Sequence, residues 1–213
     1  AFFGGGVSVT SGALTAVGNT FDGNDAATLD GGGLYIANTL GQALLLESNT
    51  FVGNTAGDDA GAAHLQDSLG LVRWNVFEGN AAVDRGGALH LHTTSGVLNV
   101  ENNLFVGNTA DRGAGIFSFT ASPFVDSNTF VDNDSTGLNS SAAVRIFEGV
   151  VRNNIVAFGQ GQGVDNTGGA ATFSFNTVYG FGGGSWVDAD LTGIDGNLYV
   201  DPQFEGYDGS RVY

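Results

Sequence analysis

The chain has 213 residues, of which 42% are apolar and 36 are glycine, while only two are proline. This composition excludes a disordered polar tract, and the glycines lack the strict period of collagen. The formal charge of −16 argues against nucleic-acid binding, because the surface would repel phosphates, and the lack of cysteine excludes disulfides and zinc–thiolate sites.

The N-terminal segment, residues 1–4, lacks the charged start of a signal peptide. No apolar run approaches the roughly 18 residues that a membrane-spanning helix needs. We therefore expect no membrane insertion. We predict a single domain over residues 1–213 and interpret the sequence as a segment of a larger protein.

A six-residue motif, Asn-Thr-Phe-Asp-Gly-Asn at 19–24, recurs along the chain at intervals of 21 to 30 residues. Its other copies are at 49–54, 75–80, 103–108 and 128–133, with decayed forms at Asn154, Asn176 and Asn197. The aromatic position is expected to stack inside a core, as Phe21, Phe51, Phe77, Phe105 and Phe130, continued by Val156, Val178 and Tyr199. The flanking asparagines are predicted to form structural ladders: Asn19, Asn49, Asn75, Asn103 and Asn128, and Asn24, Asn54, Asn80, Asn108 and Asn133.

A second, glycine-rich motif keeps phase with the first, at 31–36, 60–65, 86–91, 113–118 and 141–146. Each copy ends in a short alternating segment typical of a strand, and no stretch predicts a long amphipathic helix. The pattern predicts an all-β, single-stranded right-handed parallel β-helix of about eight rungs, with 21–30 residues in each rung.

The paired Phe-x-x-Asn and Gly-Gly-Ala-Leu motifs, the latter best at 86–89, resemble the repeats of polymorphic outer-membrane proteins. Residues 197–204 look like the closing rungs of secreted bacterial β-helix proteins of the pectate-lyase-like superfamily. The resemblance implies an extracellular or cell-surface adhesin. The superfamily also contains polysaccharide lyases and glycoside hydrolases, so it leaves an enzyme as the alternative.

Two ladders on the strands of the second motif are expected to point outward and to form a contact patch. They comprise Tyr35, His64, His90, Phe117 and Arg145, followed by His92, Phe119 and Phe147. Stacked rings suit a sugar face or a protein partner. Coverage by another segment is the competing interpretation, and a transition metal on His90 and His92 is a third.

Aspartates directly precede the glycine motif and should accumulate along one edge: Asp30, Asp58, Asp59, Asp84 and Asp111. Their mutual repulsion could be relieved by Arg85 and Arg112, or by Ca²⁺ bridging the rungs. No other cofactor is expected.

The sequence assigns no catalytic residue, although acid pairs occur at Asp58 and Asp59, at 132 and 134, and at 188 and 190. We predict a non-enzymatic structural or adhesive scaffold, able to take part in a fibre. Its expected partners are a glycan, a protein surface or copies of itself. The alternative is a polysaccharide lyase or glycoside hydrolase.

Overall fold

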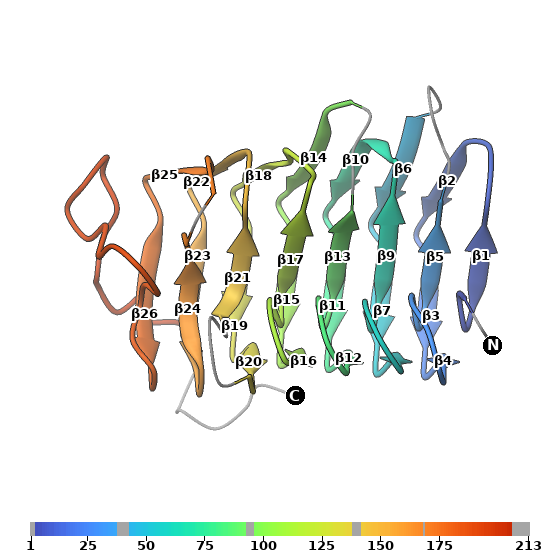
Figure 1. Cartoon of the computed structure of the whole chain (residues 1–213), viewed down its shortest axis with the longest axis horizontal. Helices are drawn as coiled ribbons and strands as arrows, with labels where there is room; N and C mark the ends of the chain where they lie inside the picture. The colour runs from blue at the N-terminus through green and yellow to red at the C-terminus, as the bar shows by residue number, and fades with distance from the viewer. Residues whose placement is uncertain (1–2, 38–42, 93–95, 138–141, 168, 206–213) are drawn as a thin grey trace.

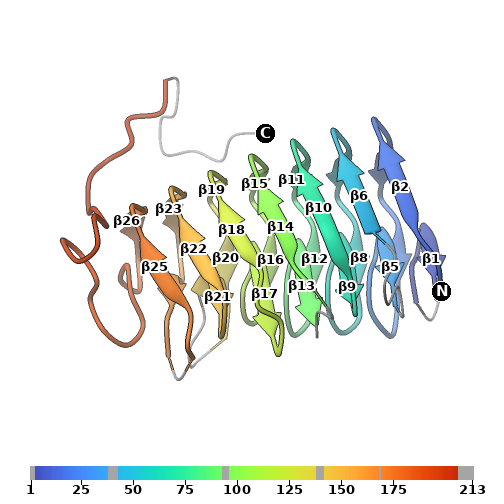
Figure 2. The same cartoon turned by 90° about the horizontal axis from the view of Figure 1, so that it is seen from above.

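The computed structural model describes residues 3–37, 43–92, 96–137, 142–167 and 169–205, which contain strands, turns and loops but no helix. The chain winds into a column in which each circuit adds one strand to each of three sheets (Figures 1 and 2). All strand pairs that join successive circuits are parallel. This arrangement is the parallel β-solenoid predicted from the repeat.

Three of the four sheets have seven strands and run the length of the column. Sheet A contains β1 (Val7–Val9), β5 (Leu34–Ile36), β9 (Ala63–Gln66), β13 (Leu89–His92), β17 (Ile116–Phe119), β21 (Ala142–Ile146) and β24 (Gln162–Asp165). Sheet B contains β2 (Leu14–Val17), β6 (Ala43–Glu47), β10 (Leu69–Arg73), β14 (Leu98–Glu101), β18 (Phe124–Asp126), β22 (Val150–Arg152) and β25 (Thr172–Ser174).

Sheet C carries the six-residue motif, and sheet D is a narrow sheet beside it. Sheet C contains β3 (Thr20–Asp22), β7 (Thr50–Val52), β11 (Val76–Glu78), β15 (Leu104–Val106), β19 (Thr129–Val131), β23 (Ile155–Gly159) and β26 (Thr177–Phe181). Sheet D contains β4 (Asp25–Ala26), β8 (Thr55–Ala56), β12 (Ala81–Ala82), β16 (Thr109–Ala110) and β20 (Asp134–Ser135). Beyond the last strands, β-pairing by the described residues of the eighth repeat consists of the single bridges of Trp186 with Val164 and of Leu198 with Thr177.

The phenylalanines of sheet C stack in register along the core. Phe51 and Phe77 are 5.0 Å apart between ring centroids, and Phe105 and Phe130 are 4.4 Å apart, with nearly parallel planes in both pairs. Val156 and Val178 continue this buried ladder in the same register. Tyr199 does not continue it, contrary to expectation. Its side chain is 57% exposed and contacts the Tyr179 ring, because Leu198 alone pairs with β26.

The buried asparagines tie neighbouring rungs together at the corner before sheet C. Asn75 Oδ1 accepts hydrogen bonds from the backbone N–H and the side chain of Asn49, at 2.9 and 3.0 Å. Asn75 Nδ2 donates to the Leu46 carbonyl and to Asn103 Oδ1. The pattern repeats as far as Asn197, and a second ladder runs from Asn24 to Asn133. Each amide thus satisfies backbone groups that would otherwise be buried without partners.

Glycine begins most copies of the second motif because the chain turns tightly there. Gly86 has a φ of +65°, and a Cβ at this position would lie 2.4 Å from the Leu89 carbonyl oxygen. Only glycine adopts such a conformation without strain. The turn leads directly into sheet A, whose inward residues Leu89 and Leu91 are fully buried. The residue between them, His90, points to the other face, where the predicted binding residues lie.

Candidate functional site

The first outward ladder of sheet A forms in the predicted register but is covered. Strand pairing aligns Tyr35, His64, His90, Phe117 and Arg145. His64 is only 3% exposed and His90 only 2%, and Tyr35 and Phe117 are also buried. The prediction of an exposed contact patch is therefore wrong for these four residues. The competing interpretation, coverage by another segment, describes them.

His64, His90 and Phe117 are covered by the row of aspartates and arginines that precedes the glycine motif, whereas Tyr35 lies against Phe3. Asp30 Oδ2 lies 3.3 Å from His64 Nδ1, and Asp59 Oδ2 lies 3.0 Å from His90 Nδ1. The Arg85 guanidinium lies 5.5 Å from the centroid of the next ring in the ladder, Phe117. The turn before each strand of sheet A thus places its charged side chains over the sheet A strand of the next rung.

Burial shifts the titration of this layer strongly. It lowers the pKa of His64 to about 3, and the charge of His90 acts in the same direction. It also raises the pKa of Asp30 to about 6. Burial by itself would raise the pKa of Asp59, but the hydrogen bond from His90 and the nearby positive charges lower it overall. At neutral pH, His64 is therefore a neutral, buried ring.

The aspartates predicted as a calcium site are interleaved with arginine. Asp58, Asp59 and Asp84 offer oxygens that all lie within 4.8 Å of one another. Arg85 lies 3.6 Å from Asp59 and 3.2 Å from Asp84, and Arg112 also pairs with Asp84. Among the described residues, this is the one grouping of three or more metal-binding side chains. It contains neither Asp30, Asp111 nor any histidine, and arginine already supplies its positive charge.

The rest of the predicted patch divides into a buried ion pair and a partly exposed strip. Arg145 Nε lies 2.9 Å from Asp165 Oδ2, and the Asp165 side chain is 1% exposed. Asp165 belongs to β24, where the repeat has decayed, so the sequence motif gave no signal for it. Of the second ladder, Phe119 is 45% exposed, while His92 and Phe147 are half-buried.

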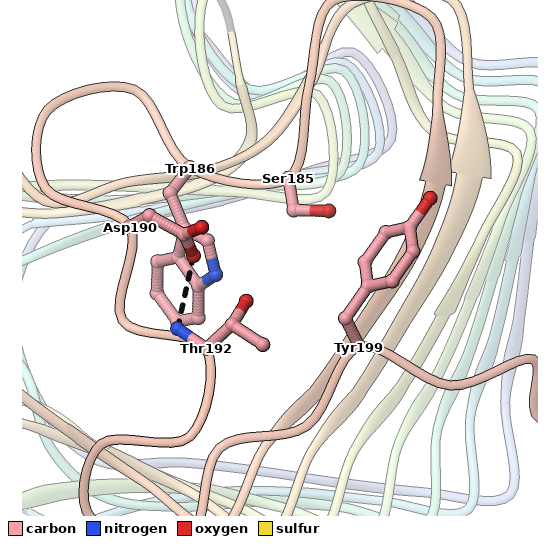
Figure 3. A pocket seen from close by; sticks show the side chains of 5 residues that line it. All are labelled: Ser185, Trp186, Asp190, Thr192 and Tyr199. Atoms are coloured by element: carbon pink, nitrogen blue, oxygen red, sulfur yellow. Dashed lines mark hydrogen bonds between the residues drawn. The ribbon is translucent and has the colours of Figure 1, made fainter.

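A pocket of about 350 Å³ lies in the segment that follows β26 (Figure 3). We call it the Trp186 pocket, and it is lined by Ser185, Trp186, Asp190, Thr192 and Tyr199. The bridges of Trp186 and Leu198 show that its two walls continue sheets A and C. The sequence singled out Asp190 as one of an acid pair and Tyr199 as the end of the aromatic ladder, but it did not predict that they meet, because residues 185–192 lie between decayed copies of the repeat. The signal available was one of only two tryptophans in a segment that the motif no longer explains.

The handedness and family of the column come from comparison with known proteins. A family model described as a right-handed beta helix region matches residues 47–198, which is more than half of the chain. The chain belongs to this right-handed β-helix family. No curated protein and no solved structure shows a significant match to it.

The acid pairs of this β-helix do not share one environment. In the described part of the β-helix, Asp134 is buried and accepts a hydrogen bond from the backbone N–H of Gln160 at 2.8 Å. Asp188 and Asp190 are exposed, and of these two only Asp190 lines the Trp186 pocket. In the part of the chain that the structure describes, no helix has the length and apolar character needed to cross a membrane.

Proposed function

We propose that this β-helix is an extracellular or cell-surface scaffold with a structural and adhesive role and no catalytic activity of its own. The observation that supports the proposal is the continuity of its ladders. The Phe51–Phe130 stack and the Asn49–Asn176 ladder run through successive rungs, and the Arg145–Asp165 pair is buried between neighbouring rungs. Such repetition makes a rigid rod, whereas an active site needs acids and a base that converge in a cleft.

The resemblance of the Phe-x-x-Asn and Gly-Gly-Ala-Leu repeats to polymorphic outer-membrane proteins favours adhesion as the role. We extend the proposal to the partners that this role implies: a glycan, a protein surface, or copies of the chain within a fibre. The partly exposed aromatic strip at Phe119 and Phe147 offers apolar contact area on one side of the rod. An acidic surface of net charge −16 favours neutral or basic partners over phosphate-rich ones.

The alternative is a polysaccharide lyase or glycoside hydrolase. A glycosidase of the usual type needs two carboxyl groups about 5 to 10 Å apart on either side of the substrate bond. The Trp186 pocket is lined by one carboxylate, that of Asp190. Since hydrolysis of this type requires a second carboxyl group as nucleophile or base, this pocket favours binding over hydrolysis.

Incubation with neutral and acidic polysaccharides tests the proposal. New reducing ends would report hydrolysis, and ultraviolet absorbance of an unsaturated uronate would report a lyase reaction. We expect retention of the protein on immobilised glycans or on cell surfaces, with no product formed. Product formation that is lost in Asp134→Asn or Asp190→Asn would contradict the scaffold proposal and establish an enzyme.

A further inference from the structure

The Trp186 pocket has a polar lining that restricts what can occupy it. The Trp186 side chain is 9% exposed, and its indole N–H has no hydrogen-bond partner among the described residues. Figure 3 shows this nitrogen on the side of the indole that faces the open centre of the pocket, toward Tyr199. A buried donor without an acceptor costs free energy, and this cost is relieved when a ligand supplies the acceptor.

The other lining groups supply acceptors and hydroxyls. The Asp190 carboxylate accepts a hydrogen bond from the backbone N–H of Thr192 at 2.9 Å, which fixes its position at the rim. Its pKa is lowered by hydrogen bonds from Thr192, so it is ionised at neutral pH. Ser185 and Thr192 each bring a hydroxyl group, and Tyr199 brings a phenol. Hydroxyl groups both donate and accept hydrogen bonds.

This combination discriminates between classes of ligand. A basic side chain could pair with Asp190, but it has no acceptor for the Trp186 N–H. An anion would satisfy the N–H, but it would meet the Asp190 carboxylate and a chain of net charge −16. An apolar ligand would satisfy neither group. A neutral polyol can accept from the indole and donate to the carboxylate at the same time.

The aromatic wall favours a ring-shaped polyol. Tyr199 is 57% exposed and lines the pocket, so it offers an accessible aromatic surface to a ligand. The axial C–H face of a sugar ring is apolar, and its hydroxyl groups lie around the edge. A volume of about 350 Å³ falls within the usual range for small-molecule sites.

We propose that the Trp186 pocket binds one neutral sugar ring, stacked on Tyr199 and held through its hydroxyl groups by Trp186 and Asp190. The proposal rests on the adhesive function proposed above and gives it a defined glycan contact. The site lies apart from the outer face of sheet A, where the sequence placed the contact patch.

Tryptophan fluorescence tests this proposal directly, because the chain has only two tryptophans. Trp74 is 53% exposed and does not line the pocket, so Trp74→Phe leaves Trp186 as the single reporter. Titration with neutral methyl glycosides should change the emission of this variant with saturation, with a Kd on the order of 1 mM. Glucuronate and methylguanidinium serve as the anionic and cationic probes, and both should bind at least several-fold more weakly.

Variants of the whole chain locate the binding, with ligand-observed NMR as the readout. Trp186→Phe keeps a ring against Phe173 but removes the N–H donor, and it should weaken binding about 3- to 10-fold. Asp190→Asn should weaken binding by a similar factor. Asp188→Asn is the matched control, since Asp188 is exposed and does not line the pocket. Thermal unfolding by circular dichroism identifies any variant that has lost its fold, and Tyr199→Ala, with an exposed side chain, then provides a second test.

The outcomes separate this proposal from the scaffold proposal. If a glycan binds and the three pocket variants bind it as well as the wild type does, the pocket proposal is overturned while an adhesive scaffold stands. If methylguanidinium saturates the site and no neutral glycoside does, the ligand class is wrong. Cleavage of the bound glycan would overturn the scaffold proposal and leave sugar binding in the pocket intact.

Discussion

At the residue scale, the fold depends on side chains that supply hydrogen-bond partners to backbone groups where the chain turns. The asparagine before each strand of sheet C accepts from one rung and donates to another, so the same residue is needed in every circuit. Apolar residues could fill the same volume, but they would leave buried N–H and carbonyl groups unpaired. The repeat of asparagine is therefore a consequence of hydrogen bonding, and the repeat of phenylalanine is a consequence of packing.

Asn103→Ala should lower the free energy of unfolding by about 3 kcal/mol. The change leaves the buried backbone N–H of Asn75 and the carbonyl of Val72 without their partners, and it breaks the contact with Asn128. Urea unfolding followed by circular dichroism measures the loss. Asn19→Ala is the matched control at the exposed start of the ladder and should cost about 1 kcal/mol or less. Equal losses in the two variants would contradict the role of the buried ladder.

The buried His64 and the half-buried Asp30 should make opposite contributions to acid stability. The pKa of His64 falls from 6.5 to about 3 on folding, so only the unfolded chain takes up this proton and stability falls as the pH drops through this window. The pKa of Asp30 rises from 3.8 to about 6, so the folded chain takes up its proton first and stability rises as the pH drops from about 6 to 3.8.

Asp30→Asn removes the stabilising contribution and should make the protein lose stability more steeply than the wild type between pH 7 and about 4.5. His64→Gln removes the destabilising contribution and should flatten the same profile. Urea unfolding across this pH range gives the slopes. Identical slopes for Asp30→Asn and the wild type would show that this pair does not govern the acid response.

At the element scale, parallel pairing places residues of successive rungs directly beside each other, so a charged residue can form an ion pair with its neighbour in the next rung. Arg145 of β21 lies beside Asp165 of β24, and Arg152 of β22 lies beside Asp126 of β18. In the first pair the Asp165 side chain is 1% exposed and the Arg145 side chain 13%, whereas the Arg152 side chain is 44% exposed. We therefore expect ion pairs of the same strand geometry to contribute very differently to the free energy of unfolding.

Arg145→Ala should destabilise the protein by about 3 kcal/mol, because it leaves the buried Asp165 carboxylate without its cation. Arg152→Ala, which breaks a solvent-screened pair of the same kind, should cost about 1 kcal/mol or less. Thermal and urea unfolding of the two variants measure the difference. A larger loss for Arg152→Ala would show that burial does not set the strength of these pairs.

At the scale of the whole molecule, a rod with net charge −16 must keep its carboxylates apart or neutralise them. The aspartate row does this with arginine: Arg85 and Arg112 lie among Asp59, Asp84 and Asp111. The row also covers the outward-pointing side chains of sheet A. The same residues thus neutralise neighbouring carboxylates and shield the outer side chains of sheet A from water.

Millimolar Ca²⁺ should leave the melting temperature of the wild type unchanged, because the arginines already neutralise Asp59 and Asp84. Arg85→Gln removes that charge, and Ca²⁺ should then raise the melting temperature, since three carboxylates remain within 4.8 Å of one another. Differential scanning calorimetry with and without the ion makes the comparison. A rise in the wild type would instead establish a resident calcium site.

The sequence alone determined the solenoid, its period and its two kinds of ladder. In a parallel coil each residue stacks on its equivalent in the next rung, so equivalent positions need similar residues and the sequence repeats. It also placed His64, His90 and Phe117 on the outer side of sheet A, from alternation within a strand. Only the tertiary structure decided that the aspartate row covers them and that Trp186, Asp190 and Tyr199 meet in one pocket. The covering of sheet A and the meeting of the pocket residues both depend on how turns fold back in space. Neither produces a periodic pattern in the sequence.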